Sequence, residues 1–396
     1  MNIEYFIRKQ SLLISKIDTE YIREEYLSLL QENEKLIGII GSRGVGKTTI
    51  LLQYLKILDR RYLYFSADDI VFQDIKLYDI VDEAYRLDRK VVVIDEIHKY
   101  NNWAMELKNI YDSFPDIKIR ISGSSMINIL FEKYDLSRRL VLFEMPPLSF
   151  REYLSIEKGV RFEKLTLSEI LADAESISTR YVMKHEDLFI LFRRYLEYGA
   201  YPFYLEGIKN FDLKLFNALD KVVNEDIPST NKIDFTHIVF FKKLIYKLIE
   251  AQKPYQVNIS KLSKELGISE PTLYTYFEIL DKSKIIKPIK KYSKNISKKP
   301  EKLLFYNTNI LYSYAKEFDK EVDMGSMRET FFVSCFNDIY YSDIGDFRVG
   351  EYIFEVGGRQ KSFKQIEGIP HSYLAIDTDY SVSNFKIPLW MFGFMR

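Results

Sequence analysis

The stretch GSRGVGKT, from Gly41 to Thr48, fits the pattern G-x-x-x-x-G-K-[S/T] at every specified position. It follows the β-branched run Leu36–Ile40 and precedes a helical pattern, the context in which this motif binds phosphates. Its glycines let backbone N–H groups close around phosphate oxygens, and the following helix adds the positive end of its dipole. We therefore expect a nucleoside triphosphate to bind to Gly41, Ser42, Arg43, Gly44, Val45, Gly46, Lys47, Thr48 and Thr49.

A second apolar run, Val91–Ile94, ends in the acids Asp95 and Glu96. Such a run predicts a buried central strand, and α/β sheets bind ligands at the carboxyl ends of their strands. Lys47 would reach the β- and γ-phosphates, and the Thr48 hydroxyl and Asp95 would hold Mg²⁺. Glu96 would polarise the water that attacks the γ-phosphate, which favours ATP hydrolysis over nucleotide storage.

Composition limits the classes of protein that remain. The 396 residues suffice for two or three domains, and Lys+Arg equal Asp+Glu at 57 each, so any nucleic-acid surface must be local. The single Cys335 excludes an internal disulfide, and four scattered histidines argue against a His-based metal site. No apolar run approaches the roughly 18 residues of a membrane helix and the start does not resemble a signal peptide, so we expect a cytoplasmic protein without a membrane partner.

The pattern of the chain predicts four parts. Short β-branched runs alternate with helical stretches in the first part, which predicts an α/β fold with a parallel sheet. The predicted strands are Leu36–Ile40, Tyr62–Phe65, Val91–Ile94, Ile117–Ile121 and Leu140–Phe143. We expect this core over residues 1–155, a helical lid over 156–232, a winged helix-turn-helix over 233–318 and a small α/β domain over 319–396.

Two polar segments of the core are further candidates for the site. Ser122 and Ser124 follow the fourth predicted strand, where a hydroxyl could contact the γ-phosphate or the attacking water; a turn that caps the next helix is the alternative. Arg138 and Arg139 precede the fifth strand. One of them could stabilise charge at the nucleotide of a neighbouring subunit, which would require a homo-oligomer, although surface arginines are also common.

Residues 258–272, NISKLSKELGISEPT, are typical of a helix-turn-helix, with Gly267 at the turn, Ser269 as helix cap and Pro271 in the first turn. The second helix lacks positive charge in its first turns, which disfavours reading of base edges. Nine lysines follow between 282 and 302. Such a ribbon favours contact with the phosphates of double-stranded DNA, and the residues expected to make it are Lys290, Lys291, Lys294, Lys298 and Lys299. A solvated loop or an internal docking module is the alternative.

Residues 346–358 predict a hairpin that turns at Gly350. It resembles the hairpin of PD-(D/E)XK nucleases, in which Asp346 and Glu355 would bind a divalent metal. The lysine expected two residues after Glu355 is replaced by Gly357, and Lys361 could reach in from the next loop. Because an incomplete acid/base set rarely catalyses, we expect a nuclease-like fold kept for binding or assembly; an ATP-licensed nuclease is the alternative.

The segments GSRGVGKTT, VVVIDEIHK, ISGSS, DLSRR and PPLSFREYL resemble a prokaryotic, archaeal-ATPase-like family of AAA+-type P-loop ATPases with a winged helix and a nuclease-like C-terminal domain. The resemblance spans essentially the whole chain. It implies that the strand of Ser122 lies between the phosphate-loop strand and the strand of Asp95, which would make the serine loop a sensor. It also implies that Gly199 to Pro202, in the helical lid, corresponds to a Gly-x-Pro signature that places Pro202 near adenine.

Besides the ATP-licensed, metal-dependent nuclease, two functional hypotheses follow from these patterns. The first is an Mg²⁺-dependent ATPase that couples its nucleotide state to DNA binding through the winged helix. The second is a nucleotide-gated switch, in which ATP sets the assembly and turnover is slow.

Overall fold

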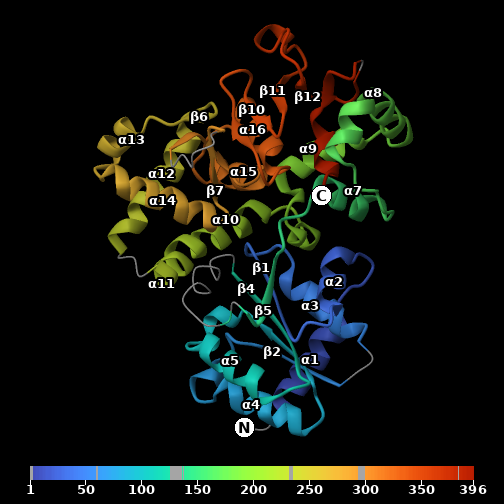
Figure 1. Ribbon diagram of the computed structural model, residues 1–396, viewed down its shortest axis with the longest axis vertical. Coiled ribbons are helices and arrows are strands. Elements are labelled where there is room, and N and C mark those ends of the chain that lie inside the picture. The colour runs from blue at the N-terminus through green and yellow to red at the C-terminus, as the bar shows by residue number, and fades with distance from the viewer. Residues whose placement is uncertain are drawn as a thin grey trace. The chain divides into compact units, whose positions relative to one another are not determined.

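The computed structural model describes residues 3–58, 61–124, 136, 138–231, 235–292, 299–381 and 383–396. The chain divides into two compact units, Met1–Pro146 and Pro147–Arg396, and Figure 1 labels their elements. Within the described ranges, none of the helices combines the length and apolar character that a membrane span requires.

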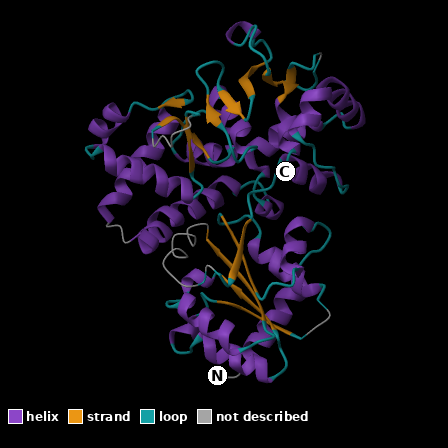
Figure 2. Ribbon diagram, in the orientation of Figure 1, coloured by secondary structure: helices purple, strands orange, loops and turns teal. Residues whose placement is uncertain are grey.

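The first unit is built on a parallel sheet of five strands in the order β2-β3-β4-β1-β5. Figure 2 colours the strands orange. The strands are β1 (Leu36–Gly41), β2 (Tyr62–Ser66), β3 (Val91–Asp95), β4 (Lys118–Ser124) and β5 (Leu140–Glu144). All five predicted strands are therefore confirmed. The predicted order is confirmed as well, because β4 pairs with β1 on one side and with β3 on the other.

Helices flank this sheet and bury its central strands. They are α1 (Glu4–Lys16), α2 (Glu24–Gln31), α3 (Lys47–Lys56), α4 (Leu77–Arg86) and α5 (Trp103–Ser113), with short turns η1 (Ile70–Gln73) and η2 (Ile97–Lys99). In Figure 1, α2 lies beside α3 and α4 beside α5, as their contacts require. Every residue of β1 and β3 is buried, so the end of each strand is held rigidly where a ligand would bind.

The second unit begins with helices, as expected for residues after Ser149. They are α7 (Phe150–Lys158), α8 (Leu167–Lys184), α9 (Leu188–Arg194), α10 (Phe211–Lys221), α11 (Ile227–Asn231) and α12 (Phe235–Glu250), with the turns η4 (Tyr195–Gly199), η5 (Pro202–Glu206) and η6 (Val222–Asp226). Ser149 with Glu152 and Thr166 with Glu169 form capping boxes that begin α7 and α8.

Next come two short helices and a three-stranded antiparallel sheet in the order β6-β8-β7. The elements are β6 (Tyr255–Gln256), α13 (Ile259–Leu266), α14 (Glu270–Lys282), β7 (Ile286–Lys290) and β8 (Pro300–Phe305). Gly267 adopts φ +69° after α13, and the Ser269 hydroxyl accepts from the Thr272 amide to begin α14. The predicted turn and cap are therefore confirmed.

The chain ends in a mixed sheet of order β13-β12-β11-β10-β9. Its elements are α15 (Thr308–Glu317), α16 (Met324–Ser334), β9 (Tyr340–Tyr341), β10 (Phe347–Val349), β11 (Tyr352–Gly358), η7 (Phe363–Gln365), β12 (Ser372–Asp377), β13 (Lys386–Pro388) and η8 (Leu389–Phe394). The predicted hairpin is confirmed, because β10 pairs with β11 across Gly350. Ring contacts among Phe332, Phe336, Phe354 and Phe392 fill this core.

Candidate nucleotide site of the first unit

The loop between β1 and α3 has the backbone that the glycine pattern predicts. Gly44 and Gly46 adopt φ +82° and +98°, a region that side chains with a Cβ rarely occupy. A Cβ on Gly41 would lie 2.3 Å from the Met145 carbonyl oxygen, so the loop also needs glycine where two backbones meet. Val45 is fully buried and anchors the loop to the core.

Lys47 points its ammonium group back into this loop. The side chain is buried, and its Nζ donates to the carbonyl oxygens of Gly41 and Ser42 at 2.9 Å each. The helix α3 begins at Lys47 with neither a side-chain cap nor an acid in its first turn. Its first amides and the ammonium therefore form a positively polarised cradle for an anion.

Asp95, at the end of β3, gathers donors from three other elements. Its Oδ2 accepts from the Thr48 hydroxyl at 2.6 Å and from the Tyr64 hydroxyl at 3.0 Å, while Oδ1 accepts from the Ser122 hydroxyl. Burial, followed by the nearby Asp95 charge, raises the pKa of Tyr64, so this phenol stays a neutral donor. Thr48 and Asp95, predicted from separate motifs, are thus brought into direct contact.

Glu96 lies beside this cluster in a left-handed backbone conformation, with φ +51°. Its amide donates to Asp95 Oδ1 at 3.1 Å and to Ser122 Oγ at 3.0 Å. On the carboxylate side, His98 Nε2 lies 3.3 Å from Glu96 Oε2, and His98 Nδ1 accepts from the Ser124 amide at 3.3 Å. The structure therefore brings together Lys47, Thr48, Asp95, Glu96, Ser122 and Ser124, and the roles expected of them stay predictions.

Sequence reasoning missed two members of this site, Tyr64 and His98. The place of Tyr64 follows only from the pairing of β2 with β3, which sets Ser66 opposite Asp95. His98 follows Glu96 by two residues, but its partner Ser124 is 26 residues away. Residue spacing alone does not show that contact.

The residues fit Mg²⁺ together with a nucleotide. Thr48 and Asp95 supply adjacent oxygens, the hard ligands that Mg²⁺ prefers, and Mg²⁺ usually takes its remaining ligands from phosphates and water. Within the part of the chain that the structure describes, no three His, Cys, Asp or Glu side chains lie close enough to hold a metal by themselves. The donor set thus fits a metal that arrives with a phosphate ligand.

The two candidate arginines before β5 differ in their surroundings. Arg139 makes a two-point ion pair with Asp112 of α5, with Nε and Nη2 each 3.1 Å from a carboxylate oxygen. This pair holds Arg139 on its own core, which opposes a role at a neighbouring subunit's nucleotide. Arg138 is exposed and keeps that role as a prediction.

The segment Gly199 to Pro202 belongs to the second unit, where local packing accounts for its residues. A Cβ on Gly199 would lie 2.7 Å from the rings of Tyr153 and Tyr195. The Ala200 amide donates to Asn309 Oδ1 at 2.8 Å. Pro202 begins η5, and its role near adenine stays a prediction.

The lysine ribbon is largely engaged within the second unit. Lys291 pairs with Asp343, and Lys299 lies 3.5 Å from Glu301. Lys290 is exposed, while Lys294 and Lys298 lie outside the described residues. Lys287 donates to the carbonyl of Val333 at 3.1 Å, and burial lowers its pKa to about 8.

The predicted nuclease-like cluster has an ammonium group among its acids. Lys302 Nζ, from β8, lies 2.8 Å from Glu329 Oε2 and 3.0 Å from Asp346 Oδ1. Lys361 pairs with Glu355, and a Cβ on Gly357 would lie 2.7 Å from the Lys361 side chain. Lys361 thus reaches Glu355 from the next loop, in the space that glycine leaves. Among the described residues, Asp346 and Glu355 are part of no three-ligand metal group.

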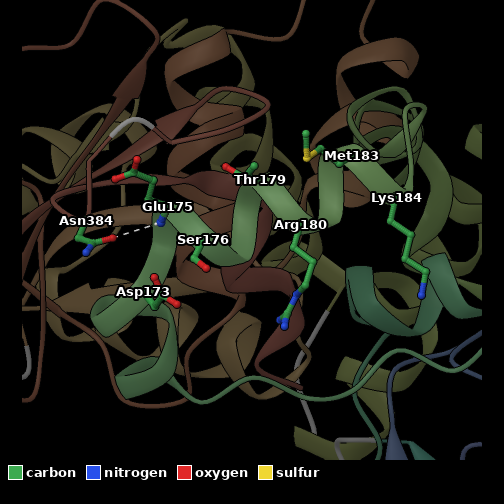
Figure 3. Close-up of a pocket in the computed structure, with 8 residues that line it drawn as sticks. All are labelled: Asp173, Glu175, Ser176, Thr179, Arg180, Met183, Lys184 and Asn384. Atoms are coloured by element: carbon green, nitrogen blue, oxygen red, sulfur yellow. Dashed lines mark hydrogen bonds between the residues drawn. The ribbon is translucent and has the colours of Figure 1, made fainter.

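A surface hollow of about 730 Å³ lies along α8 in the second unit. Figure 3 shows Ser176, Arg180 and Lys184 projecting along one side of the helix, and Asn384 accepting from the Glu175 amide at 3.2 Å. Acids and bases are mixed along this face, as on an ordinary solvated helix. The hollow therefore supplies no converging set of reactive groups.

Comparison with known proteins assigns a family description to the residues that hold this site. A family model described as an AAA domain matches residues 33–154, a range that contains the loop at 41–48, Asp95 and Ser122. Residues 33–154 are an AAA domain. A second model, described as a domain of unknown function (DUF8612), matches residues 190–321. The AAA domain is thus a P-loop ATPase domain, followed by helices and a C-terminal mixed sheet.

Individual relatives extend beyond the AAA domain. The uncharacterized protein MJ1637 of Methanocaldococcus jannaschii is 30% identical over 308 residues, which are 71% of this chain and 63% of that protein. The chain therefore spans less than two thirds of the length of this relative. The Walker-type ATPase paby2304 of Pyrococcus abyssi is 15% identical with a TM-score of 0.42, over 74% of this chain and 95% of that one. A signal transduction ATPase with a tetratricopeptide repeat sensor from Pyrococcus horikoshii is 13% identical with a TM-score of 0.31, over 81% and 45%.

Proposed function

We propose that the AAA domain binds Mg²⁺-ATP and hydrolyses it. The observation that carries this proposal is the convergence of Lys47, Thr48, Asp95 and Glu96 at the carboxyl ends of β1 and β3. These four side chains supply phosphate binding, metal binding and a base, which are the parts that phosphoryl transfer to water requires.

Each side chain has a defined task in this proposal. The Lys47 ammonium leaves the carbonyls of Gly41 and Ser42 and binds phosphate oxygens, and the loop amides bind the remaining oxygens. Thr48 and Asp95 hold Mg²⁺, which neutralises charge that develops on the β- and γ-phosphates when it is bound. The Glu96 carboxylate orients the attacking water and accepts its proton.

In this proposal Ser122 and Ser124 change their contacts with the nucleotide state and thereby affect Asp95 and Glu96. The Ser122 hydroxyl contacts Asp95 and accepts from the Glu96 amide at 3.0 Å. A γ-phosphate that attracts this hydroxyl changes both contacts, so β4 acts as the sensor strand.

Calorimetric titration with Mg²⁺ and a non-hydrolysable ATP analogue tests the binding step. We expect Lys47→Ala to weaken binding at least about 10-fold, because a buried charge-assisted contact is worth more than about 1.4 kcal/mol. Lys16→Ala, an exposed residue at the end of α1, serves as the matched control. Equal affinity of Lys47→Ala and wild type would refute nucleotide binding at this loop.

The surroundings of β7 and β8 favour a second candidate function, an internal docking module. Two of the nine lysines contact α16 and the β10 hairpin. Lys302 is buried and pairs with Glu329 and Asp346, and the half-buried Lys287 donates to the carbonyl of Val333. Lys291 forms a bridge to Tyr341 of β9. The exposed first turn of α14 carries Glu270 rather than basic residues. We propose that residues 235–305 are a winged helix-turn-helix that fastens the C-terminal sheet rather than one that binds DNA.

DNA titration distinguishes docking from DNA coupling. If residues 235–305 are a docking module, we expect the steady-state ATPase rate to change less than about 2-fold when double-stranded DNA is added at low salt. DNA coupling through the ribbon expects stimulation that fades as salt rises, because phosphate contacts release counterions. A strongly stimulated, salt-sensitive rate that Lys290→Glu reduces would replace the docking proposal.

The cluster around Lys302 bears on the nuclease alternative. The Lys302 ammonium lies between Glu329 and Asp346 and supplies the positive charge that a metal ion would supply in a nuclease. In this proposal the two acids therefore bind Lys302 of β8 and hold the domain together, rather than binding a metal. We expect plasmid DNA to stay intact with Mg²⁺ or Mn²⁺ and ATP. Cleavage that disappears in Asp346→Ala would contradict this expectation.

A further inference from the structure

His98 lies on the η2 turn, directly after β3, between Glu96 and the end of β4. Its side chain is 11% exposed, against 22% for Glu96, so both groups face the interior of the site. One ring nitrogen, Nε2, lies 3.3 Å from Glu96 Oε2, and the other, Nδ1, lies 3.3 Å from the Ser124 amide nitrogen. The imidazole therefore spans the gap between the proposed base and the sensor strand.

The contact with Ser124 assigns the tautomer of this ring. A backbone N–H is always a donor, so Nδ1 must be the acceptor and carries no proton. The proton of the neutral imidazole is then on Nε2, which faces the Glu96 carboxylate. The neutral ring thus accepts from β4 and turns its remaining N–H toward the Glu96 carboxylate.

The backbone conformation of Glu96 indicates that its side chain is held in place by its neighbours. Glu96 is not a glycine, yet it adopts φ +51°, a conformation that persists only where the surroundings enforce it. The Glu96 amide is held by Asp95 and Ser122, whereas the far end of the side chain faces His98. The amide contacts hold the backbone, and the ring is placed to orient the carboxylate.

We infer that His98 is a positioning residue. It orients the Glu96 carboxylate toward the attacking water, and it makes this orientation depend on the position of the Ser124 amide. The inference rests on the proposed ATP hydrolysis. A displacement of the end of β4 moves the Ser124 amide, the ring follows, and the carboxylate turns with it. His98 does not touch the nucleotide in this scheme, so its removal changes turnover without changing nucleotide affinity.

Three substitutions in the 396-residue chain distinguish the contact of Nδ1 from the contact of Nε2. His98→Phe keeps the size of the side chain and removes both polar contacts. His98→Gln retains a donor that is long enough to reach Glu96, whereas His98→Asn places its amide near the position of Nδ1 and falls short of Glu96. We expect kcat to fall about 10- to 100-fold in the Phe and Asn variants, since small misplacement of a catalytic group has effects of this size. We expect His98→Gln to recover most of the rate.

The split between KM and kcat distinguishes positioning from general damage. We expect KM for Mg²⁺-ATP and the Kd of a non-hydrolysable analogue to stay within about 3-fold of wild type in all three variants. Wild-type kcat in His98→Phe overturns the inference. If that variant does not fold, equal kcat in the Gln and Asn variants overturns it instead.

A double-mutant cycle with Glu96→Gln tests whether His98 acts through the carboxylate. When Glu96 is already Gln, adding His98→Phe should change the residual rate less than about 2-fold. The same fold-loss in both backgrounds would refute positioning of Glu96. Failure of the proposed function looks different, because wild type itself would then hydrolyse no more ATP than Lys47→Ala.

Discussion

At the scale of single residues, the Asp95 carboxylate is the centre of the nucleotide site. It accepts hydrogen bonds from Thr48, Tyr64, Ser122 and the Glu96 amide. Four donors around one buried carboxylate hold it in one orientation, which would prepare it for the proposed Mg²⁺ before nucleotide arrives. We therefore expect its neighbours to affect both the stability and the metal dependence of the AAA domain.

Tyr64→Phe tests one of these donors. Because hydrogen bonds to charged groups contribute about 1.5–3 kcal/mol, we expect the free energy of unfolding of the first unit to fall by about 2 kcal/mol. The chain has two tryptophans, so Trp390→Phe leaves Trp103 of α5 as a fluorescent reporter of this unit during urea unfolding. Tyr5→Phe is the control, because its hydroxyl contacts Asp69, whose carboxylate also accepts from the Lys9 ammonium; an equal effect of both would contradict the prediction.

Glu329 predicts a pH dependence of the second unit. Burial, opposed by Lys302 and reinforced by Asp346 and Glu355, raises the pKa of Glu329 from 4.5 to about 7. The folded protein then binds more protons than the unfolded chain between these values. Stability is therefore lost as pH rises from 4.5 to 7, by roughly 3 kcal/mol at most.

Urea unfolding at pH 5 and pH 8 checks this sign, with Trp390 as the reporter in a Trp103→Phe background. Other carboxylates titrate over the same range, so the quantity to compare is the difference between wild type and Glu329→Gln. Wild type should lose more stability than the variant on going to pH 8. A difference of opposite sign would show that Glu329 is ionised with a low pKa in the folded state.

At the scale of elements, local patterns predicted the strands well and the cross-strand contacts poorly. The apolar runs of β1 and β3 are long enough to be recognised alone, and each ends at a residue of the proposed site. Lys302, by contrast, stands in a lysine-rich stretch, yet it is buried because Glu329 and Asp346 lie 27 and 44 residues later. Such a pairing depends on how distant segments fold together, as does the contact between His98 and Ser124, so sequence spacing does not show it.

Lys302→Met tests the attachment of β8 to the C-terminal elements. Removing one partner of a buried ion pair costs about 3–5 kcal/mol, because the remaining charges lose their compensation. We expect a loss of about 3 kcal/mol in the free energy of unfolding, reported by Trp390. Lys299→Met is the matched control, since its pair with Glu301 is exposed and should change stability by less than about 1 kcal/mol. Equal small losses would mean that the Lys302 cluster does not fasten the elements.

At the scale of the whole molecule, the AAA domain and the second unit differ in what supports their roles. The AAA domain is identified by its family model and by the geometry of its site. The second unit is described by its own contacts, and part of it matches a domain of unknown function. The helices α13 and α14 were recognisable from Gly267, Ser269 and Pro271. The contacts of the following strands with the C-terminal elements were not, because Lys287 and Lys302 meet partners far along the chain.

Substitution of Arg138 and Arg139, the two arginines before β5, tests whether subunits share nucleotide sites. If subunits share nucleotide sites, Arg138→Ala should lower kcat at least about 10-fold, because an arginine supplied by a neighbour stabilises transition-state charge. Arg139→Ala should mainly lower stability, since Arg139 binds Asp112 of its own core. Light scattering with an ATP analogue provides the second measurement. A purely monomeric protein with an unaffected Arg138→Ala variant would contradict shared sites.

The central claim is that Glu96 is the base of an ATP-hydrolysing site. The most direct measurement is the release of phosphate from Mg²⁺-ATP by wild type, Glu96→Gln and the exposed control Glu25→Gln, with nucleotide binding measured on the same samples. We predict that Glu96→Gln binds ATP normally and hydrolyses it at least about 100-fold more slowly, while Glu25→Gln matches wild type. Hydrolysis by Glu96→Gln at the wild-type rate would contradict the claim.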